Sequence, residues 1–463
     1  MNIDLVYAAF ALAALAALAV FRFLPPAVAV LVVFLGGWIV LPVGVFPPGS
    51  SAVDFPYWIT GLAVPSDMLF TKAWAAPAAA LLGVLMFDRA ALLRLRPVWA
   101  DLPLVAWCLW PLLQSAGAVQ PQPAGWVASL YLIGSWGLPW LLGRLYFATP
   151  DGQLLLIKGL VFAGVACLPF SLIEGALGPV TYAWLYELHP FRLDGAARYI
   201  GSRPIGFFEH GNQFGLWVSL CALAAVWLAW TTPHGPRSQL YRGLAVLVVA
   251  MAVAAQSVGG ILILALGVAL LSASRWVRPR FMLAGASAVL ILSGAVYVSG
   301  VVPIARIAKD TAIGQRAVGV FKSIGRGSFT WRIAQDQRLM GEAMKKPLTG
   351  SANWAWWRDK DMRPWGLTVL VIGQFGLIGL AACLATLLWP AIAAAWRSPR
   401  GSPWRMETLP FVLAMILGLT VFDALMNSFI FFPALLAAGA LAANSALRRP
   451  ATGSRPASVP APS

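Results

Sequence analysis

One short segment of the sequence combines residue types that bind anions and move protons. It reads RPIGFFEHGNQFGLW, from Arg203 to Trp217, and runs directly into the apolar stretch VSLCALAAVWLAW. A guanidinium group such as that of Arg203 donates two parallel hydrogen bonds to a phosphate. Glu209 and His210 can accept a proton, and Asn212 offers a neutral donor and acceptor. The order of these residues predicts a polar site at the mouth of an apolar helix.

The composition of the chain indicates that this helix crosses a membrane. Of the 463 residues, 60% are hydrophobic and only 11% charged, and the mean hydropathy is +0.78. Soluble domains have about 45–50% apolar and about 25% charged residues. Apolar stretches long enough to cross a bilayer recur along the chain, and the alternation typical of membrane β-barrels is absent. We therefore predict an all-α fold, a polytopic transmembrane helix bundle of about 12–13 spans.

Hydropathy divides the chain into six expected parts. They are the N-terminal transmembrane helices (1–176), a first long loop (177–209), the central transmembrane helices (210–301), a large loop (302–365), the C-terminal transmembrane helices (366–446) and a disordered tail (447–463). Short loops rich in arginine alternate with short loops that lack basic residues, which predicts a cytoplasmic C-terminus. The same alternation predicts that both long loops lie on the outer face.

Both long loops are nevertheless basic, and two interpretations remain open. The first loop contains Arg198 and Arg203, and the second contains Arg332 and Arg338 among other cations. Basic segments beside a membrane gain about 1 kcal/mol per residue from anionic head groups. Alternatively, the loops form a site for an anionic substrate. Arginine outnumbers lysine in them, and its planar fork suits bidentate contacts to phosphate.

The sequence contains no motif for several classes of chemistry. There is no Walker loop, Rossmann fingerprint, His-Glu-x-x-His or Cys-x-x-Cys pattern, and no metal site or cofactor is expected. The predicted spans contain few ionisable groups, which argues against an ion-coupled transporter. Lys158 and Glu174 lie near the ends of their span, where we expect both side chains to reach the membrane surface.

Four segments together resemble a known family. They are RPIGFFEHGNQFGLW at 203–217, AQSVGGILILALG at 255–267, SFTWRIAQDQRLMGEAMKKPLTG at 328–350 and VLVIGQFGLIGL at 369–380. In order and spacing, over roughly residues 190–385, they resemble the O-antigen ligase and polymerase family of integral membrane glycosyltransferases. The resemblance implies a metal-independent enzyme of the bacterial inner membrane with its active face in the periplasm.

The resemblance also implies substrates and residue roles. The donor would be an undecaprenyl-pyrophosphate-linked oligosaccharide, the acceptor a glycan hydroxyl, and the remaining partners membrane lipids, with no nucleic acid. Pyrophosphate departure needs fixed positive charge, and hydroxyl attack needs a general base. The expected site residues are the phosphate ligands Arg203 and Arg332, then Arg338 and Arg198; the bases His210 and Glu209, with Asp336, Asp359 and Asp361 in reserve; and the substrate contacts Asn212 and Trp365.

The chain departs from the family pattern at one catalytic position. The family has a histidine about ten residues before the Gly-Leu-Ile-Gly segment, whereas this chain has Trp365 near that place and no histidine from 235 to 463. This difference favours a polysaccharide polymerase over a ligase. An O-antigen ligase and a protein O-oligosaccharyltransferase remain enzyme alternatives. A polysaccharide-lipid flippase or carrier, and a scaffold subunit, are alternatives without chemistry.

Overall fold

The protein is all-helical. The computed structural model describes residues 3–44, 71–118, 121–186, 189, 196–198, 200–299, 302, 304–323, 328–360, 362–398, 404–425, 427 and 432–444. Within these residues every regular element is a helix, and the only β-pairings are three isolated bridges. The predicted all-α fold is therefore confirmed. The predicted tail, 447–463, lies outside the described residues.

The helices make the chain a multi-pass membrane protein. In the described part, seven helices are long and apolar enough to cross a bilayer: Asp4–Phe23, Pro150–Leu177, Gly211–Thr231, Pro236–Ala254, Pro279–Val296, Leu367–Arg397 and Met406–Ala424. Four shorter apolar helices accompany them: Pro26–Val40, Lys72–Phe87, Val258–Ala273 and Pro433–Ala443. Several of the 12–13 expected spans are shorter or broken helices, so the exact number of spans stays a prediction.

The N-terminal part shows how such breaks arise. Its helices are α1 (Ile3–Phe23), α2 (Pro26–Val40), α3 (Lys72–Phe87), α4 (Arg89–Leu93), η3 (Trp99–Asp101), α5 (Leu102–Ser115), α6 (Gly125–Leu132), the π-helical turn η4 (Ile133–Gly137), α7 (Leu138–Tyr146), α8 (Pro150–Ala166) and α9 (Leu168–Leu177). The apolar segment 125–146 is thus divided by η4. The junction of α8 and α9 falls at Cys167, just before Pro169, whose nitrogen cannot donate a helical hydrogen bond.

The central part is built around one enclosed helix. It contains α10 (Thr181–Tyr186), α11 (Gly211–Thr231), α12 (Pro236–Ala254), α13 (Val258–Ala273) and α14 (Pro279–Ser299). Among the seven long apolar helices, α11 is the most enclosed, because 83% of its apolar 18-residue segment is buried inside the protein. Only a short hairpin, residues 255–257, separates α12 from α13.

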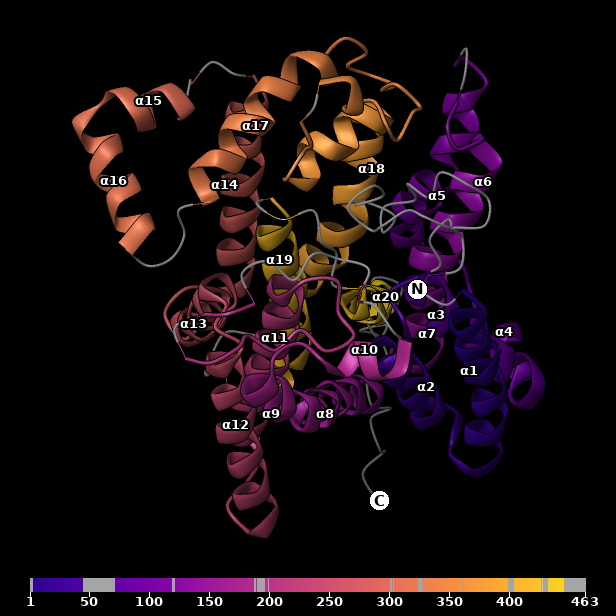
Figure 1. The fold of residues 1–463 in the computed structure, drawn as a ribbon. Coiled ribbons are helices and arrows are strands. Elements are labelled where there is room, and N and C mark those ends of the chain that lie inside the picture. The colour runs from indigo at the N-terminus through magenta and orange to yellow at the C-terminus, as the bar shows by residue number, and fades with distance from the viewer. Residues whose placement is uncertain are drawn as a thin grey trace, which may run out of the picture.

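The large loop is mostly helical. Its elements are α15 (Ile304–Asp310), α16 (Ala312–Ser323), α17 (Ser328–Ala343) and η5 (Arg358–Lys360), and the chain then continues through α18 (Leu367–Arg397), η6 (Met406–Thr408), α19 (Leu409–Ala424) and α20 (Pro433–Asn444). In Figure 1, α15, α16 and α17 lie at one end of the molecule, far from the lower end of α12. Of these, α17 lies beside the upper part of α18, whereas α15 and α16 lie beyond α14.

A break in α18 joins two of the sequence motifs. Gly376 has φ 71° and ψ −175°, a backbone conformation open essentially to glycine alone. The turn that follows α17 fits against this break. The amide of Leu377 donates to the Pro347 carbonyl (2.8 Å), and the amide of Ala352 donates to the Gln374 carbonyl (3.0 Å). The end of α17 is therefore fixed to α18, so the large loop cannot move independently of the membrane helices at this point.

Connections that the charge alternation placed on one side of the membrane lie together. The Gln256 side chain, in the hairpin between α12 and α13, donates to the Ile200 carbonyl (2.6 Å) and accepts from the Ile200 amide (3.1 Å). The amide of Gln122, in another connection expected on the same side, donates to the Ala352 carbonyl (2.9 Å). The two long loops and these shorter turns therefore form one surface layer.

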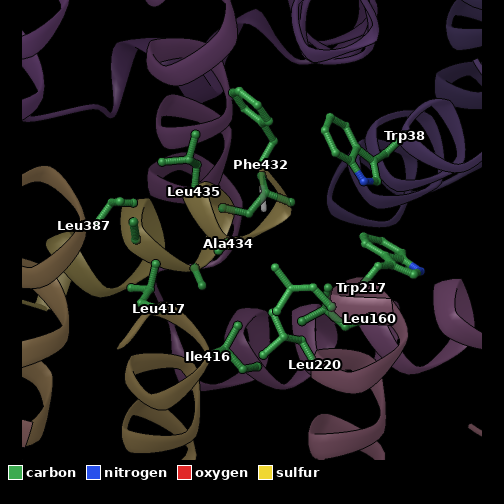
Figure 2. Packing of buried hydrophobic residues seen from close by; sticks show 14 of the residues in the cluster. Trp38, Leu160, Trp217, Leu220, Leu387, Ile416, Leu417, Phe432, Ala434 and Leu435 are labelled. Atoms are coloured by element: carbon green, nitrogen blue, oxygen red, sulfur yellow. The ribbon is translucent and has the colours of Figure 1, made fainter. Parts of the chain in front are cut away.

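Below this layer, α11 packs into a continuous apolar core. Figure 2 shows Trp217 and Leu220 of α11 near Leu160 of α8 and Ile416 of α19. All four side chains are buried. Each large apolar side chain removed from contact with lipid or water adds packing enthalpy that fixes the helix start. The polar residues at the N-terminus of α11 thus stand on a rigid support.

Candidate anion-binding site

The turn that leads into α11 is held by a buried carboxylate. Glu174 of α9 is fully buried, and its Oε2 accepts hydrogen bonds from the amides of Ile205 and Gly206, both at 2.7 Å. Its Oε1 accepts from the amide and the hydroxyl of Thr181. Gly206 has φ +58°, and a Cβ there would lie 2.7 Å from the Phe170 ring. The expectation that Glu174 reaches the membrane surface is wrong, because its charge satisfies backbone donors in the interior.

A buried lysine holds the same turn from the opposite direction. Lys72, the first residue of α3, is fully buried. Its Nζ donates to the carbonyls of Phe207 (2.7 Å) and Trp38 (3.2 Å). The ammonium also lies over the Trp38 and Phe208 rings, 4.7 and 4.6 Å from their centroids. Glu174 and Lys72 together fix the backbone between Arg203 and His210.

His210 forms the N-terminal cap of α11. Its backbone is extended, and its Nδ1 accepts a hydrogen bond from the Asn212 amide at 3.0 Å. A neutral imidazole whose Nδ1 accepts carries its proton on Nε2. His210 therefore presents a donor, the geometry of a group that binds an anion rather than one that removes a proton.

The charges of four guanidinium groups act on this imidazole. Burial and the charges of Arg203, Arg332, Arg198 and Arg363 lower the pKa of His210 to about 3. These arginines come from both long loops, and the charges acting on His210 are all positive. Like charges gathered in a partly dehydrated place are unfavourable unless an anion neutralises them. The arrangement is that of an anion-binding site.

Arg203 is the most enclosed of these cations. It is only 3% exposed, and its Nη2 donates to Asn212 Oδ1 at 2.6 Å. Its side chain crosses the start of α11 so closely that a Cβ at Gly211 would collide with it. The partial positive charge of a helix N-terminus adds to that of the guanidinium. Arg203 is thus a fixed part of the site and not a surface charge.

Arg332 reaches the site from α17 and is fixed by two contacts. Its Nη1 donates to Asn427 Oδ1 at 2.7 Å, and its guanidinium lies 4.7 Å from the centroid of the Trp365 ring. Arg363 lies 3.9 Å from the same centroid. Asn427 Nδ2 in turn donates to Asp423 Oδ1 at 3.0 Å. Trp365 therefore supports two cations, and a chain of hydrogen bonds continues from Arg332 to a carboxylate at the end of α19.

Glu209 lies on the interior side of the turn. Its Oε1 accepts from Gln213 Nε2 and its amide donates to Gln213 Oε1, both at 3.0 Å. Burial raises the pKa of the Glu209 carboxyl, while the Lys72 charge and the Gln213 hydrogen bond oppose that rise. The charged partner of Glu209 is thus Lys72 and not the arginine cluster. Although adjacent in sequence, Glu209 and His210 face different charges.

Most of the residues predicted for the site come together. Those assembled around His210 are Arg203, Arg332, Arg198, Asn212 and, through Arg332, Trp365. Arg338 is exposed on α17, and its charge is not among those that act on His210. Their roles in binding or catalysis stay predictions.

The reserve carboxylates do not join the cluster. Asp336 is buried, and its two oxygens accept from the amides of Trp365 (2.6 Å) and Gly366 (2.9 Å), which holds the start of α18. Asp361 and the side chain of Asp359 lie outside the described part of the chain. Asp336 is therefore a residue that positions Trp365.

Sequence reasoning missed four residues around the site. They are Lys72, Arg363, Asp423 and Asn427. A signal was available for two of them, because an ionisable residue in or beside an apolar span is a functional candidate by default. Lys72 begins a predicted span, and Asp423 is the single charged residue of α19. The convergence of Arg363 and Asn427 depends on contacts between distant segments.

No family model matches the chain, and no curated protein matches it. Among the described residues, no group of three or more His, Cys, Asp or Glu could hold a metal ion. The fold and the site define a multi-pass helical membrane protein with a group of arginines near the start of its most enclosed long helix.

The low pKa of His210 makes folding stability depend on pH. Between about pH 6.5 and pH 3 the unfolded chain binds a proton at His210 that the folded chain does not. The stability gained from neutral His210 is therefore complete above about pH 6.5 and is lost as the pH falls, by at most about 1.4 kcal/mol per pH unit. His210→Asn keeps a capping side chain and removes this titration. We expect wild type to lose more stability than His210→Asn between pH 7.5 and 5, measured by thermal unfolding in detergent.

The matched control is His234→Asn, because His234 is exposed in the turn before α12. This variant should follow the pH dependence of wild type. A constant stability difference between wild type and His210→Asn across the range would show that His210 titrates normally.

Proposed function

We propose that this protein is a polysaccharide polymerase that uses a lipid-pyrophosphate-linked glycan donor at the periplasmic face of the bacterial inner membrane. The observation that carries the proposal is the buried Arg203 lying across the start of α11, bound to Asn212 beside the neutral donor His210. The charges of Arg332, Arg198 and Arg363 also act on this imidazole. The resemblance of four segments to the O-antigen ligase and polymerase family supports the same donor class. The substrate would be an undecaprenyl-pyrophosphate-linked oligosaccharide, and the acceptor a sugar hydroxyl.

The burial of Arg203 favours a phosphate site over attraction to lipid head groups. A cation that only attracts a charged surface keeps its guanidinium in water, where contacts are worth little and salt screens them. Arg203 is 3% exposed and bound to Asn212. A rigid, partly dehydrated guanidinium acts on charge that develops in the transition state without reorganising. The cluster therefore suits a departing pyrophosphate.

An apolar groove beside the site suits the lipid chain of such a donor. A cavity of about 300 Å³ lies between α14 and α18. Its lining includes Thr368, three residues after Trp365, and Leu425, two residues before Asn427. A molecule with an anionic head and a long apolar chain would place the head among the arginines and the chain in the groove.

The chemistry follows from these positions. The acceptor hydroxyl oxygen bonds to the anomeric carbon and its proton passes to water. The bond from that carbon to the pyrophosphate oxygen breaks, and the electron pair stays on the pyrophosphate. Arg203, Arg332 and the Nε2–H of His210 stabilise this developing charge. In this proposal His210 is an anion ligand, because its Nδ1 already accepts from the Asn212 amide.

The direct test is to remove the two arginines that come from different loops. Arg203→Ala and Arg332→Ala should each lower glycan transfer about 30- to 1000-fold, equal to about 2–4 kcal/mol. Replacement by Lys should restore only part of the rate, because an ammonium lacks the planar fork. The assay is nucleotide-free polymer formation from a lipid-pyrophosphate-linked glycan by the purified protein in detergent.

Lys345→Ala and Lys346→Ala are the matched controls, since both lysines are exposed in the same large loop. They should polymerise at nearly the wild-type rate. If the lysine variants lose activity and the arginine variants keep it, the proposed site is wrong. If wild-type protein transfers no glycan, the proposed function is wrong.

The groove allows a separate test of the lipid. Gly294 lines it, and a Cβ at this glycine would meet no atom within 4 Å, so Gly294→Trp can fill the groove without disturbing the helix. We expect it to weaken use of the lipid-linked donor at least about tenfold, or about 1.4 kcal/mol. Binding of inorganic pyrophosphate should not change. Gly285→Trp, on the same helix and equally unobstructed, is the control. Equal effects of both variants on donor use would count against the groove.

A further inference from the structure

A half-exposed tryptophan stands next to the arginines of the proposed pyrophosphate site. Trp331 is the residue before Arg332 in α17, and it is 51% exposed. Its ring packs against that of Trp365, with centroids 5.3 Å apart and ring planes inclined at 58°. Resting on the proposed function, we propose that Trp331 binds a sugar of the lipid-linked donor by stacking against the sugar ring.

The neighbouring Trp365 is fixed by the protein and lies among cations. Its indole N–H donates to Gln335 Oε1 at 3.0 Å. The guanidinium groups of Arg332 and Arg363 lie 4.7 and 3.9 Å from its ring centroid. The Trp365 ring therefore supports the cations, and Trp331 is the ring of the pair that is more open to a ligand.

An aromatic ring and a sugar ring are chemically complementary. The face of an indole carries partial negative charge, which attracts the polarised C–H groups on the apolar face of a sugar. The hydroxyl groups of the sugar point outward from the rim of its ring and stay in water. A half-exposed indole such as that of Trp331 can therefore bind a sugar without removing water from all of its hydroxyls.

The position of Trp331 relative to the arginines suits the sugar nearest the pyrophosphate. The Trp331 and Trp365 ring centroids are 5.3 Å apart, and the Arg332 guanidinium carbon lies 4.7 Å from the Trp365 centroid. The separation of the Trp331 ring centre from that carbon therefore cannot exceed the sum of these two distances. A sugar joined directly to a phosphate at Arg332 lies within this range, so one donor molecule can contact both residues.

Membrane anchoring is the competing explanation for an exposed tryptophan, since tryptophans gather at membrane–water interfaces. The helix that carries Trp331 does not favour it. Among the described helices, α17 is not one of those long and apolar enough to cross a bilayer, and four of its 16 residues are charged. The exposed Trp126, at the start of the apolar helix α6, has the position expected of an anchor.

Trp331→Ala is the direct test, and its first readout is binding rather than turnover. We expect the affinity for an undecaprenyl-pyrophosphate-linked oligosaccharide to fall about tenfold, because a stacking contact is lost. The affinity for undecaprenyl pyrophosphate without sugar should not change. Trp331→Leu, which keeps apolar bulk against Trp365, should show the same selective loss, and Trp331→Phe should lose much less. Both affinities are measured with the purified protein in detergent.

Trp126→Ala is the matched control, because it removes a similarly exposed tryptophan and should leave both affinities unchanged. If Trp331→Ala and Trp331→Leu bind the sugar-free lipid as weakly as the donor, the ring only supports its neighbours and the assignment is overturned. Donor affinity equal to that of wild type in these two variants would overturn it as well.

The outcomes also distinguish this inference from the proposed function. If wild type polymerises glycan, Trp331→Ala should raise the KM for the donor and change kcat little, because the contact exists both before and during the reaction. If wild type polymerises and the variant has an unchanged KM and affinity, the sugar contact fails and the polymerase proposal stands. If wild type binds the donor through Trp331 but transfers no glycan, the polymerase proposal fails and the sugar contact stands.

Discussion

The site depends on the turn of residues 205–208, whose backbone is satisfied by buried ionisable side chains. Glu174 accepts from two of its amides, Lys72 donates to the Phe207 carbonyl, and the His189 ring contacts the Phe208 carbonyl at 3.0 Å. An unpaired backbone group buried away from water costs several kcal/mol. The non-helical turn can persist in this buried position because the protein supplies these partners.

These contacts determine where the anion ligands stand. Arg203 precedes the turn and His210 follows it, so any shift of the turn would move both at once. Buried charges are weak evidence for stability, but removing one partner leaves the others buried without a compensating charge or hydrogen bond. The combination of Glu174, Lys72 and Glu209 therefore allows essentially one register for the chain entering α11. The apolar packing of α11 in Figure 2 then fixes the helix below.

Much of the fold and part of the site could be predicted from the sequence. Composition and hydropathy predicted an all-helical membrane protein, and the association of Arg203, Arg332, His210 and Asn212 followed from their motifs. Hydropathy does not show where a helix breaks, as α18 does at Gly376. A glycine in an apolar run looks the same in a sequence whether or not it interrupts a helix.

Side-chain direction could not be predicted from proximity in the chain. Glu209 and His210 are neighbours, yet one faces Lys72 and the other faces the arginines, because one precedes the helix and the other caps it. Glu174 looked able to reach the surface, and only the folded chain shows that two amides need its carboxylate. Asp423 joins the site through Asn427 and Arg332, contacts that link segments distant in the chain.

The central claim is that the arginine cluster holds the pyrophosphate of a lipid-linked donor. It is tested most directly by an experimental structure of the protein in lipid nanodiscs with undecaprenyl pyrophosphate bound. The account predicts pyrophosphate density in contact with the guanidinium groups of both Arg203 and Arg332 and beside His210 Nε2. Pyrophosphate bound instead at Lys345 and Lys346, with no density between Arg203 and Arg332, would contradict it.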